Sequence, residues 1–93
     1  MKNIKGYLGF ALKSKNILFG VDQIIENKKP AFVILYSNLS ENSFTKLKKF
    51  ATYNNIYSKQ VEEEVLPLGC KAIAITEKNL AQAIKEKLEV EDC

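Results

Sequence analysis

The sequence predicts an α/β protein, a three-layer α/β/α sandwich around a small mixed four-stranded sheet. Segments with helical hydrophobic periodicity alternate with short apolar runs along the chain. Two of those runs, at residues 31–36 and 72–76, are nearly unbroken, which is typical of strands covered on both faces. The 93 residues contain no linker, repeat or low-complexity segment, so residues 1–93 are expected to form one domain.

The first helix is predicted by five apolar residues that share one helical face. They are Ile4, Tyr7, Leu8, Ala11 and Leu12. Gly6 and Gly9 fall inside this helix, where each costs about 1 kcal/mol relative to Ala. We expect the close approach of another backbone to account for them.

A strand, a short helix and a second strand are predicted next. Residues 17–19 are an apolar run that ends at Gly20, and residues 21–27 place apolar side chains on one helical side. Pro30 is suited to the start of a strand and not to its middle. The apolar run at residues 31–36 therefore predicts a buried strand that begins directly after Pro30.

The second half repeats the alternation. Asn38 or Ser40 can cap a third helix, and Asn38 with Glu41 fits a capping box. The apolar stripe of this helix is Phe44, Leu47, Phe50 and Ala51. Asn54-Asn55 ends it, and a weaker strand is expected over residues 56–59.

The last quarter of the chain predicts a turn, a strand and a helix. Residues 61–66 suit a helical turn, and the acidic run at 62–64 suits an exposed face better than paired catalytic carboxylates. Thr76 ends the strand at 72–76 and is expected to cap the final helix. The apolar stripe of that helix is Leu80, Ala81, Ile84 and Leu88.

Charge is distributed unevenly along the chain. Residues 1–59 carry ten Lys and three acidic residues, a net charge of +7, whereas residues 60–93 carry four Lys and eight acidic residues, a net charge of −4. Every basic residue is Lys, which binds phosphate but lacks the planar fork with which Arg recognises guanine. The basic half therefore predicts either a solvated surface or affinity for a nucleic-acid backbone.

Several classes of protein are not expected. No run of about eighteen apolar residues is present, so no membrane span is predicted. Cys70 and Cys93 make no disulfide framework, which favours a reducing, cytoplasmic location. The chain has no His, the commonest general base and metal ligand, and Cys70 fits a structural role. We therefore expect no catalysis, no metal and no cofactor.

Two turns are expected to meet at one edge of the sheet. Residues 20–23 and 37–40 both lie where a strand gives way to a helix, and free backbone N–H groups there can receive an anion. Four lysines near these segments are the expected phosphate contacts. They are Lys13, Lys15, Lys28 and Lys29.

Five segments occur in an order and spacing that indicate a family. They are Leu8–Ala11, Phe19–Asp22, Ala31–Leu35, Ser37–Asn42 and Ala72–Thr76. Over about residues 4–88 the chain resembles the ribosomal kink-turn RNA-binding superfamily of archaeal L-seven-Ae and eukaryotic L-thirty-e proteins. It is most similar to the short bacterial members. The resemblance implies a non-catalytic protein of translation that binds structured RNA, expected to be ribosomal.

The resemblance also implies a site. Kink-turn binders carry Gly-x-Asn-Glu-x-x-Lys where residues 20–26 lie here, and of that motif only Gly20 is kept. Asp22 and Gln23 occupy the base-reading positions, and Glu26 replaces the phosphate-binding Lys. The loop before the last strand adds further contacts. The residues implied there are Leu66, Gly69 and Lys71. We expect recognition of a bent or bulged RNA.

Alternatives remain open at each position. Gly20 and Gly69 also fit turns that need a positive φ, and Asp22 and Gln23 also fit an ordinary helix start. The chain is expected to be a monomer. It can also be a protein-interaction module that has kept the fold and lost the RNA site, with a ribosomal or other protein as partner. An exposed apolar patch near Leu66 and Leu68 would favour that function.

Overall fold

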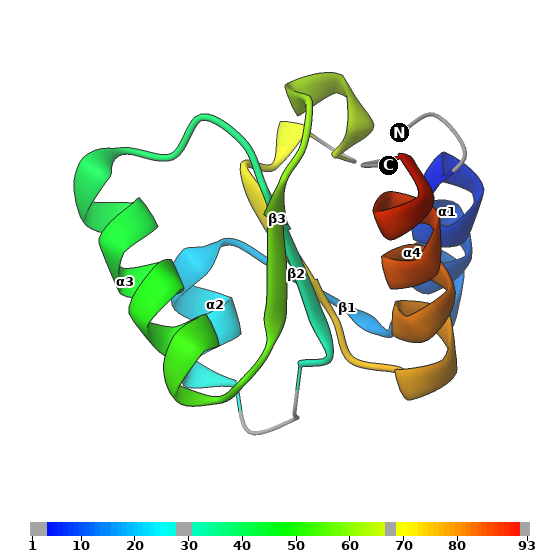
Figure 1. Cartoon of the computed structure of the whole chain (residues 1–93), viewed down its shortest axis with the longest axis horizontal. Helices are drawn as coiled ribbons and strands as arrows, with labels where there is room; N and C mark the ends of the chain where they lie inside the picture. The colour runs from blue at the N-terminus through cyan, green and yellow to red at the C-terminus, as the bar shows by residue number, and fades with distance from the viewer. Residues whose placement is uncertain (1–3, 28–30, 67–68, 92–93) are drawn as a thin grey trace.

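The structure of the protein, a computed structural model, describes residues 4–27, 31–66 and 69–91. Four α-helices and a mixed four-stranded sheet make up this part of the chain, which confirms the predicted α/β class (Figure 1). The elements are α1 (Lys5–Ser14), β1 (Ile17–Phe19), α2 (Val21–Glu26), β2 (Val33–Tyr36), α3 (Glu41–Tyr53), β3 (Tyr57–Gln60), the 3₁₀ turn η2 (Glu63–Val65), β4 (Ala72–Ile75) and α4 (Lys78–Glu91).

The sheet has the strand order β1-β4-β2-β3. β4 is antiparallel to both of its neighbours, and β3 is parallel to β2. Consequently β1, β2 and β3 all end at one end of the sheet, where Phe19 and Tyr36 lie and where β4 begins at Ala72. We call this the carboxyl end of the sheet. The helices α2 and α3 both begin there.

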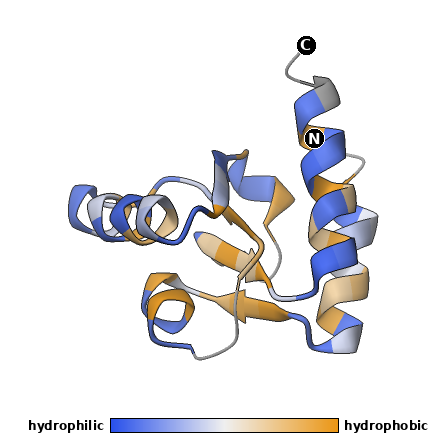
Figure 2. Cartoon of the chain, turned by 60° about the horizontal axis from the view of Figure 1, so that its bottom comes forward, coloured by the Kyte–Doolittle hydropathy of each residue, from blue (hydrophilic) through white to orange (hydrophobic). Residues whose placement is uncertain are grey.

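Helices cover both faces of the sheet. On one face, Leu8 of α1 and Ile84 of α4 pack with Val33 and Ile73, which are fully buried. On the other face, buried side chains of α2 and α3 pack against alternate strand residues. They are Ile24, Leu47 and Ala51 against Leu18, Ile34, Tyr36 and Ala74. Figure 2 shows hydrophobic residues concentrated in the sheet, whereas the surrounding helices carry both hydrophobic and hydrophilic residues. Burial on both faces explains the uninterrupted apolar runs.

The structure decides the caps of two helices. Of the two residues predicted as possible caps of α3, Ser40 is the cap, because its side-chain oxygen accepts a hydrogen bond from the Ser43 N–H at 3.3 Å. Asn38 instead adopts a left-handed backbone with φ 48° and donates to Glu63. At α4 the carboxylate of Glu77 accepts from the Leu80 N–H, so Glu77 takes the capping role predicted for Thr76.

The two glycines of α1 also differ from expectation. A Cβ placed on Gly6 or Gly9 would meet nothing within 4 Å among the atoms of the described chain. The expected close approach of another backbone is therefore absent from the described structure. Nothing in the packing of the described residues requires glycine at either position.

Candidate nucleic-acid interface

A groove at the carboxyl end of the sheet brings the two predicted turns together. It has a volume of about 560 Å³. Its walls are the start of α2, the start of α3 and the residues that lead into β4. The lining residues are Phe19, Gly20, Val21, Asp22, Gln23, Leu39, Ser40, Ser43, Lys71 and Ala72. Four of the ten predicted site residues, Gly20, Asp22, Gln23 and Lys71, thus share one hollow.

Gly20 forms the turn between β1 and α2. Its backbone has φ 86° and ψ 148°, a conformation that is essentially confined to glycine. Its N–H donates to the Ala72 carbonyl at 2.9 Å, and its carbonyl accepts from the Ile24 N–H at 3.0 Å. These bonds tie the groove wall to β4 on one side and begin α2 on the other. Turn geometry alone accounts for glycine here.

Gln23 is held by a hydrogen bond across this turn. Its Oε1 accepts from the backbone N–H of Phe19 at 2.7 Å. The side-chain oxygen of Gln23 is occupied by this bond. The two N–H donors of its amide nitrogen, Nε2, are not used by it. The side chain is exposed, and no described residue accepts from Nε2. Gln23 therefore offers the groove a hydrogen-bond donor of fixed orientation.

The start of α3 forms the facing wall. Ser40 satisfies the Ser43 N–H, while the Phe44 N–H begins the helical ladder by donating to the Ser40 carbonyl. The N–H groups of Glu41 and Asn42 belong to the first turn and have no acceptor within the helix. This end of a thirteen-residue helix carries partial positive charge. The wall thus favours a ligand that accepts hydrogen bonds.

The charge at the groove is mixed. Lys71 is exposed and its carbonyl accepts from the Ser37 N–H at 2.8 Å, which anchors it beside the end of β2. Asp22 is exposed in the same groove, and Glu41 is exposed in the first turn of α3. The groove is therefore poorly suited to hold a polyanion by charge alone. The groove instead offers oriented hydrogen-bond donors, at Gln23 and at the start of α3.

Lys13 and Lys15 do not join this groove. Lys15 caps the end of α1 with φ 61°, and Asn16 beside it accepts from the Thr76 N–H, beyond the last residue of β4. The two lysines thus lie at the opposite end of the sheet, separated from the groove by a four-residue strand, about 13 Å. The lysine-lined rim expected from the sequence is not formed by these residues. Lys28 and Lys29 lie outside the described residues.

The loop before β4 contributes less than expected. Leu66 is only 5% exposed and belongs to the core beneath α1 and α4. Its side chain is therefore not exposed for the RNA contact that the resemblance implied there. Gly69 is exposed with φ 68°, which fits a turn, and Leu68 lies outside the described residues.

A basic and aromatic surface on α3 was missed by the site prediction. Lys46, Lys48 and Lys49 are all exposed on the helix that begins at the groove. Tyr53, at the end of α3, is 81% exposed. Phe44, expected in the core, is 39% exposed and packs edge-on against Tyr36. In the sequence, the repeated lysines of this amphipathic helix were the feature that could have indicated this surface.

Three further observations concern possible metal sites, cysteine and membrane-spanning helices. They hold no group of three His, Cys, Asp or Glu side chains placed to bind a metal ion. Cys70 is a free, half-buried thiol that packs against the core. No helix in the described ranges is long and apolar enough to cross a bilayer.

Comparisons with known proteins bear on the fold alone. No protein family matches the chain, and no curated protein matches it. A solved structure of a protein of unknown function from Bacillus halodurans is similar, with a TM-score of 0.77 and 16% sequence identity. The similarity covers 88% of this chain and 92% of that one. The same arrangement of helices and strands therefore occurs in a distant sequence.

Proposed function

We propose that this protein is a non-catalytic, cytoplasmic RNA-binding protein of ribosomal type that recognises a bent or bulged structured RNA. The observation that carries the proposal is the meeting of the Gly20 turn, the α3 start and Lys71 in one groove. The family resemblance over residues 4–88 supports it. A groove lined with oriented donors suits the acceptor-rich edges and phosphates that a distorted RNA exposes.

Each part of the groove has a role in this proposal. The Nε2 of Gln23 donates to a base edge, since its oxygen is engaged by the Phe19 N–H. The first-turn N–H groups of α3 and the Nζ of Lys71 receive a phosphate. Asp22 accepts from an exocyclic amino group or a ribose hydroxyl. Recognition of the sheared pairs of an archaeal kink-turn would need a donor at Asp22, so a related but different bend is the proposed target.

The lysines of α3 extend the contact beyond the groove. An RNA strand that leaves the α3 start along the outer side of this helix meets Lys48 and Lys49 and then Tyr53. Lysine neutralises phosphates, and an exposed tyrosine offers a flat face on which an unpaired base can stack. These residues replace Lys13 and Lys15 as the proposed phosphate contacts.

The decisive experiment is a titration against two RNAs of equal length, one with a kink and one an unkinked duplex, at about 50 and 200 mM salt. Preferential binding to the kinked RNA at both concentrations supports the proposal. Equal, salt-sensitive binding to both RNAs would reduce the function to backbone affinity and contradict recognition of a bend. Absence of binding to either would contradict RNA binding and favour a protein partner.

A further inference from the structure

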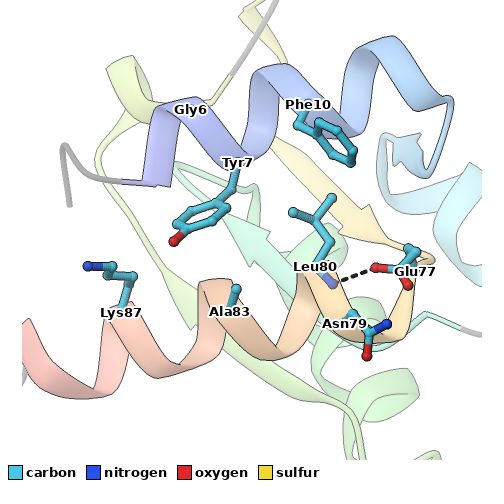
Figure 3. A pocket seen from close by; sticks show the side chains of 8 residues that line it. All are labelled: Gly6, Tyr7, Phe10, Glu77, Asn79, Leu80, Ala83 and Lys87. Atoms are coloured by element: carbon cyan, nitrogen blue, oxygen red, sulfur yellow. Dashed lines mark hydrogen bonds between the residues drawn. The ribbon is translucent and has the colours of Figure 1, made fainter.

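Each face of the sheet carries a hollow between its two helices. Between α1 and α4 the hollow has a volume of about 620 Å³, and Tyr7 and Leu80 point from the two helices into the space between them (Figure 3). Most of the surface of that hollow is apolar. Between α2 and α3 lies a hollow of about 570 Å³, which we call the α2/α3 cleft. Its lining is mixed, with charged side chains from both helices and an exposed aromatic ring.

The α2 wall of this cleft carries carboxylates. Asp22 and Glu26 are both exposed, and because they are four residues apart their side chains share one side of α2. Ile25, half-buried between them, adds an apolar surface. Asp22 also lines the groove at the carboxyl end of the sheet, so the two hollows adjoin. A carboxylate only accepts hydrogen bonds, and this wall therefore suits a ligand edge that presents donors.

The α3 wall carries lysines and aromatic rings. Lys46, Lys49, Phe50 and Tyr53 are three and four residues apart, so they share one side of the helix. Phe50 is half-buried, whereas Tyr53 is 81% exposed. Among the described residues, no ion pair joins these lysines to the carboxylates of α2. The cleft thus presents opposite charges on its two walls, with an exposed aromatic ring beside them.

We propose that the α2/α3 cleft binds an unpaired guanine nucleotide of the RNA. The inference rests on the proposed function, and it names the base that Tyr53 receives. A nucleotide combines a flat ring, a hydrogen-bonding edge and a phosphate. These three parts match the ring of Tyr53, the carboxylates of α2 and the lysines of α3. The proposed RNA path along α3 already reaches Lys49 and Tyr53, which line the cleft.

The carboxylates select guanine among the four RNA bases. Guanine presents two neighbouring donors on its Watson–Crick edge, the N1–H and the exocyclic amino group, and one carboxylate can accept from both. Adenine and cytosine place a ring nitrogen beside their amino group, and uracil places carbonyl oxygens on both sides of its N3–H. Each of these bases would set an acceptor against the carboxylate, which is unfavourable.

Glu26 is the residue assigned to this contact. It lines the cleft but not the groove at the carboxyl end of the sheet, whereas Asp22 lines both. Asp22 therefore stands between the two parts of the bound RNA, and Glu26 is left to determine the identity of the base in the cleft.

The first test is an NMR titration of the full chain with guanosine, inosine and adenosine monophosphates, each up to about 5 mM. Guanosine monophosphate should shift the backbone amides of residues 22–26 and 46–54 and bind at least about fivefold more tightly than adenosine monophosphate. Inosine monophosphate retains the N1–H but lacks the exocyclic amino group, so it should bind more weakly than guanosine monophosphate. Equal binding of the inosine and guanosine nucleotides, or no shift in the cleft, would overturn the proposal.

A substitution at Glu26 tests the contact itself. Glu26→Gln replaces a pure acceptor by an amide, which pairs well with adenine, so the preference for guanosine over adenosine monophosphate should be lost. Glu64→Gln is the matched control, because it makes the same change at an exposed residue outside the cleft and should leave the preference within about twofold of the parent. Equal effects of the two substitutions would contradict the assignment of Glu26.

Tyr53 is tested in the same way. Tyr53→Ala should weaken the binding of guanosine and adenosine monophosphates alike, by at least about fivefold, because stacking does not depend on the identity of the base. Phe10→Ala is the control, since it removes an exposed ring from the hollow between α1 and α4 and should change neither affinity. Unchanged affinity in Tyr53→Ala would remove the ring from the site.

An RNA titration separates this inference from the proposed function. A kinked RNA whose unpaired guanines are replaced by inosine should bind at least about fivefold more weakly than the parent RNA. Equal affinities would contradict the inference and leave RNA binding intact. Guanosine monophosphate bound in the cleft of a protein without affinity for the parent RNA would contradict both the proposed function and an RNA origin of the guanine.

Discussion

The Oε1 of Gln23 accepts a hydrogen bond from the backbone N–H of Phe19 at 2.7 Å, across the turn that joins β1 to α2. This bond stabilises the turn and at the same time decides which side of the amide is available to a ligand. In the proposed function, the stabilising bond and the ligand contact therefore use different atoms of one side chain. Substitutions at Gln23 can separate the two.

Gln23→Glu and Gln23→Ala are expected to act differently. Glu retains an oxygen for the Phe19 N–H but has no N–H donor, so stability should be kept while RNA affinity falls. Ala removes both, and should lower the free energy of unfolding by about 1 kcal/mol as well as reducing affinity. Urea denaturation and RNA titration measure the two effects. Unchanged RNA affinity in Gln23→Glu would remove Nε2 from the proposed site.

Charge reversal distinguishes the two lysine pairs. Lys48→Glu with Lys49→Glu should weaken RNA binding by at least tenfold and reduce its salt dependence, because two phosphate contacts are lost. Lys13→Glu with Lys15→Glu is the control, since it makes the same change in net charge at the opposite end of the sheet. If both double variants lose the same RNA affinity in a binding titration, the attraction is non-specific and the RNA does not follow α3.

Two glycines should respond in opposite directions to Ala. Gly20→Ala forces a Cβ onto a backbone with φ 86° and should lower the free energy of unfolding by about 1–3 kcal/mol. Gly9→Ala places a methyl group in open space within a helix and should raise it by about 0.5–1 kcal/mol. Urea melts of both variants check this. A destabilised Gly9→Ala would indicate that the position is not open in solution.

The cap of α3 can be assigned by a similar comparison. Ser40→Ala removes the acceptor of the Ser43 N–H and should lower the free energy of unfolding by about 1 kcal/mol. Asn38→Gly should have a small effect, because glycine tolerates the left-handed backbone at φ 48° and the lost bond to Glu63 is exposed. Thermal denaturation measures the loss of stability in each of the two variants. A larger loss from Asn38→Gly would return the capping role to Asn38.

Local signals predicted most of the fold. β1 has its predicted bounds because an apolar run meets Gly20, and α4 buries the four residues of its predicted stripe. The cap predicted at Thr76 was wrong because Glu77, the next residue, is the acceptor, and the choice between Asn38 and Ser40 was left open because both are good caps. Residue type alone does not show which of two nearby residues caps a helix, because the backbone geometry between the preceding strand and the helix selects one.

The site was harder to predict because it depends on contacts between distant segments. The two turns were placed together correctly, since both follow strands that end at the same end of the sheet. Lys13 and Lys15 are close to Gly20 in the chain, yet the length of β1 separates them from it in space. Leu66 was expected at the surface with its loop, whereas packing beneath α1 and α4 buries it. Neither outcome can be derived from local sequence.

The position of β4 has a consequence for the order of folding. This strand comes last in the sequence but lies between β1 and β2, and the carbonyl of Ala72 receives the Gly20 N–H that shapes the groove. Until residues 72–75 are in place, β1 has no partner strand among the described strands, and the Gly20 N–H lacks its acceptor. The groove therefore cannot be assembled during synthesis of the first seventy residues. We expect the groove to be completed late in folding, together with the closure of the sheet.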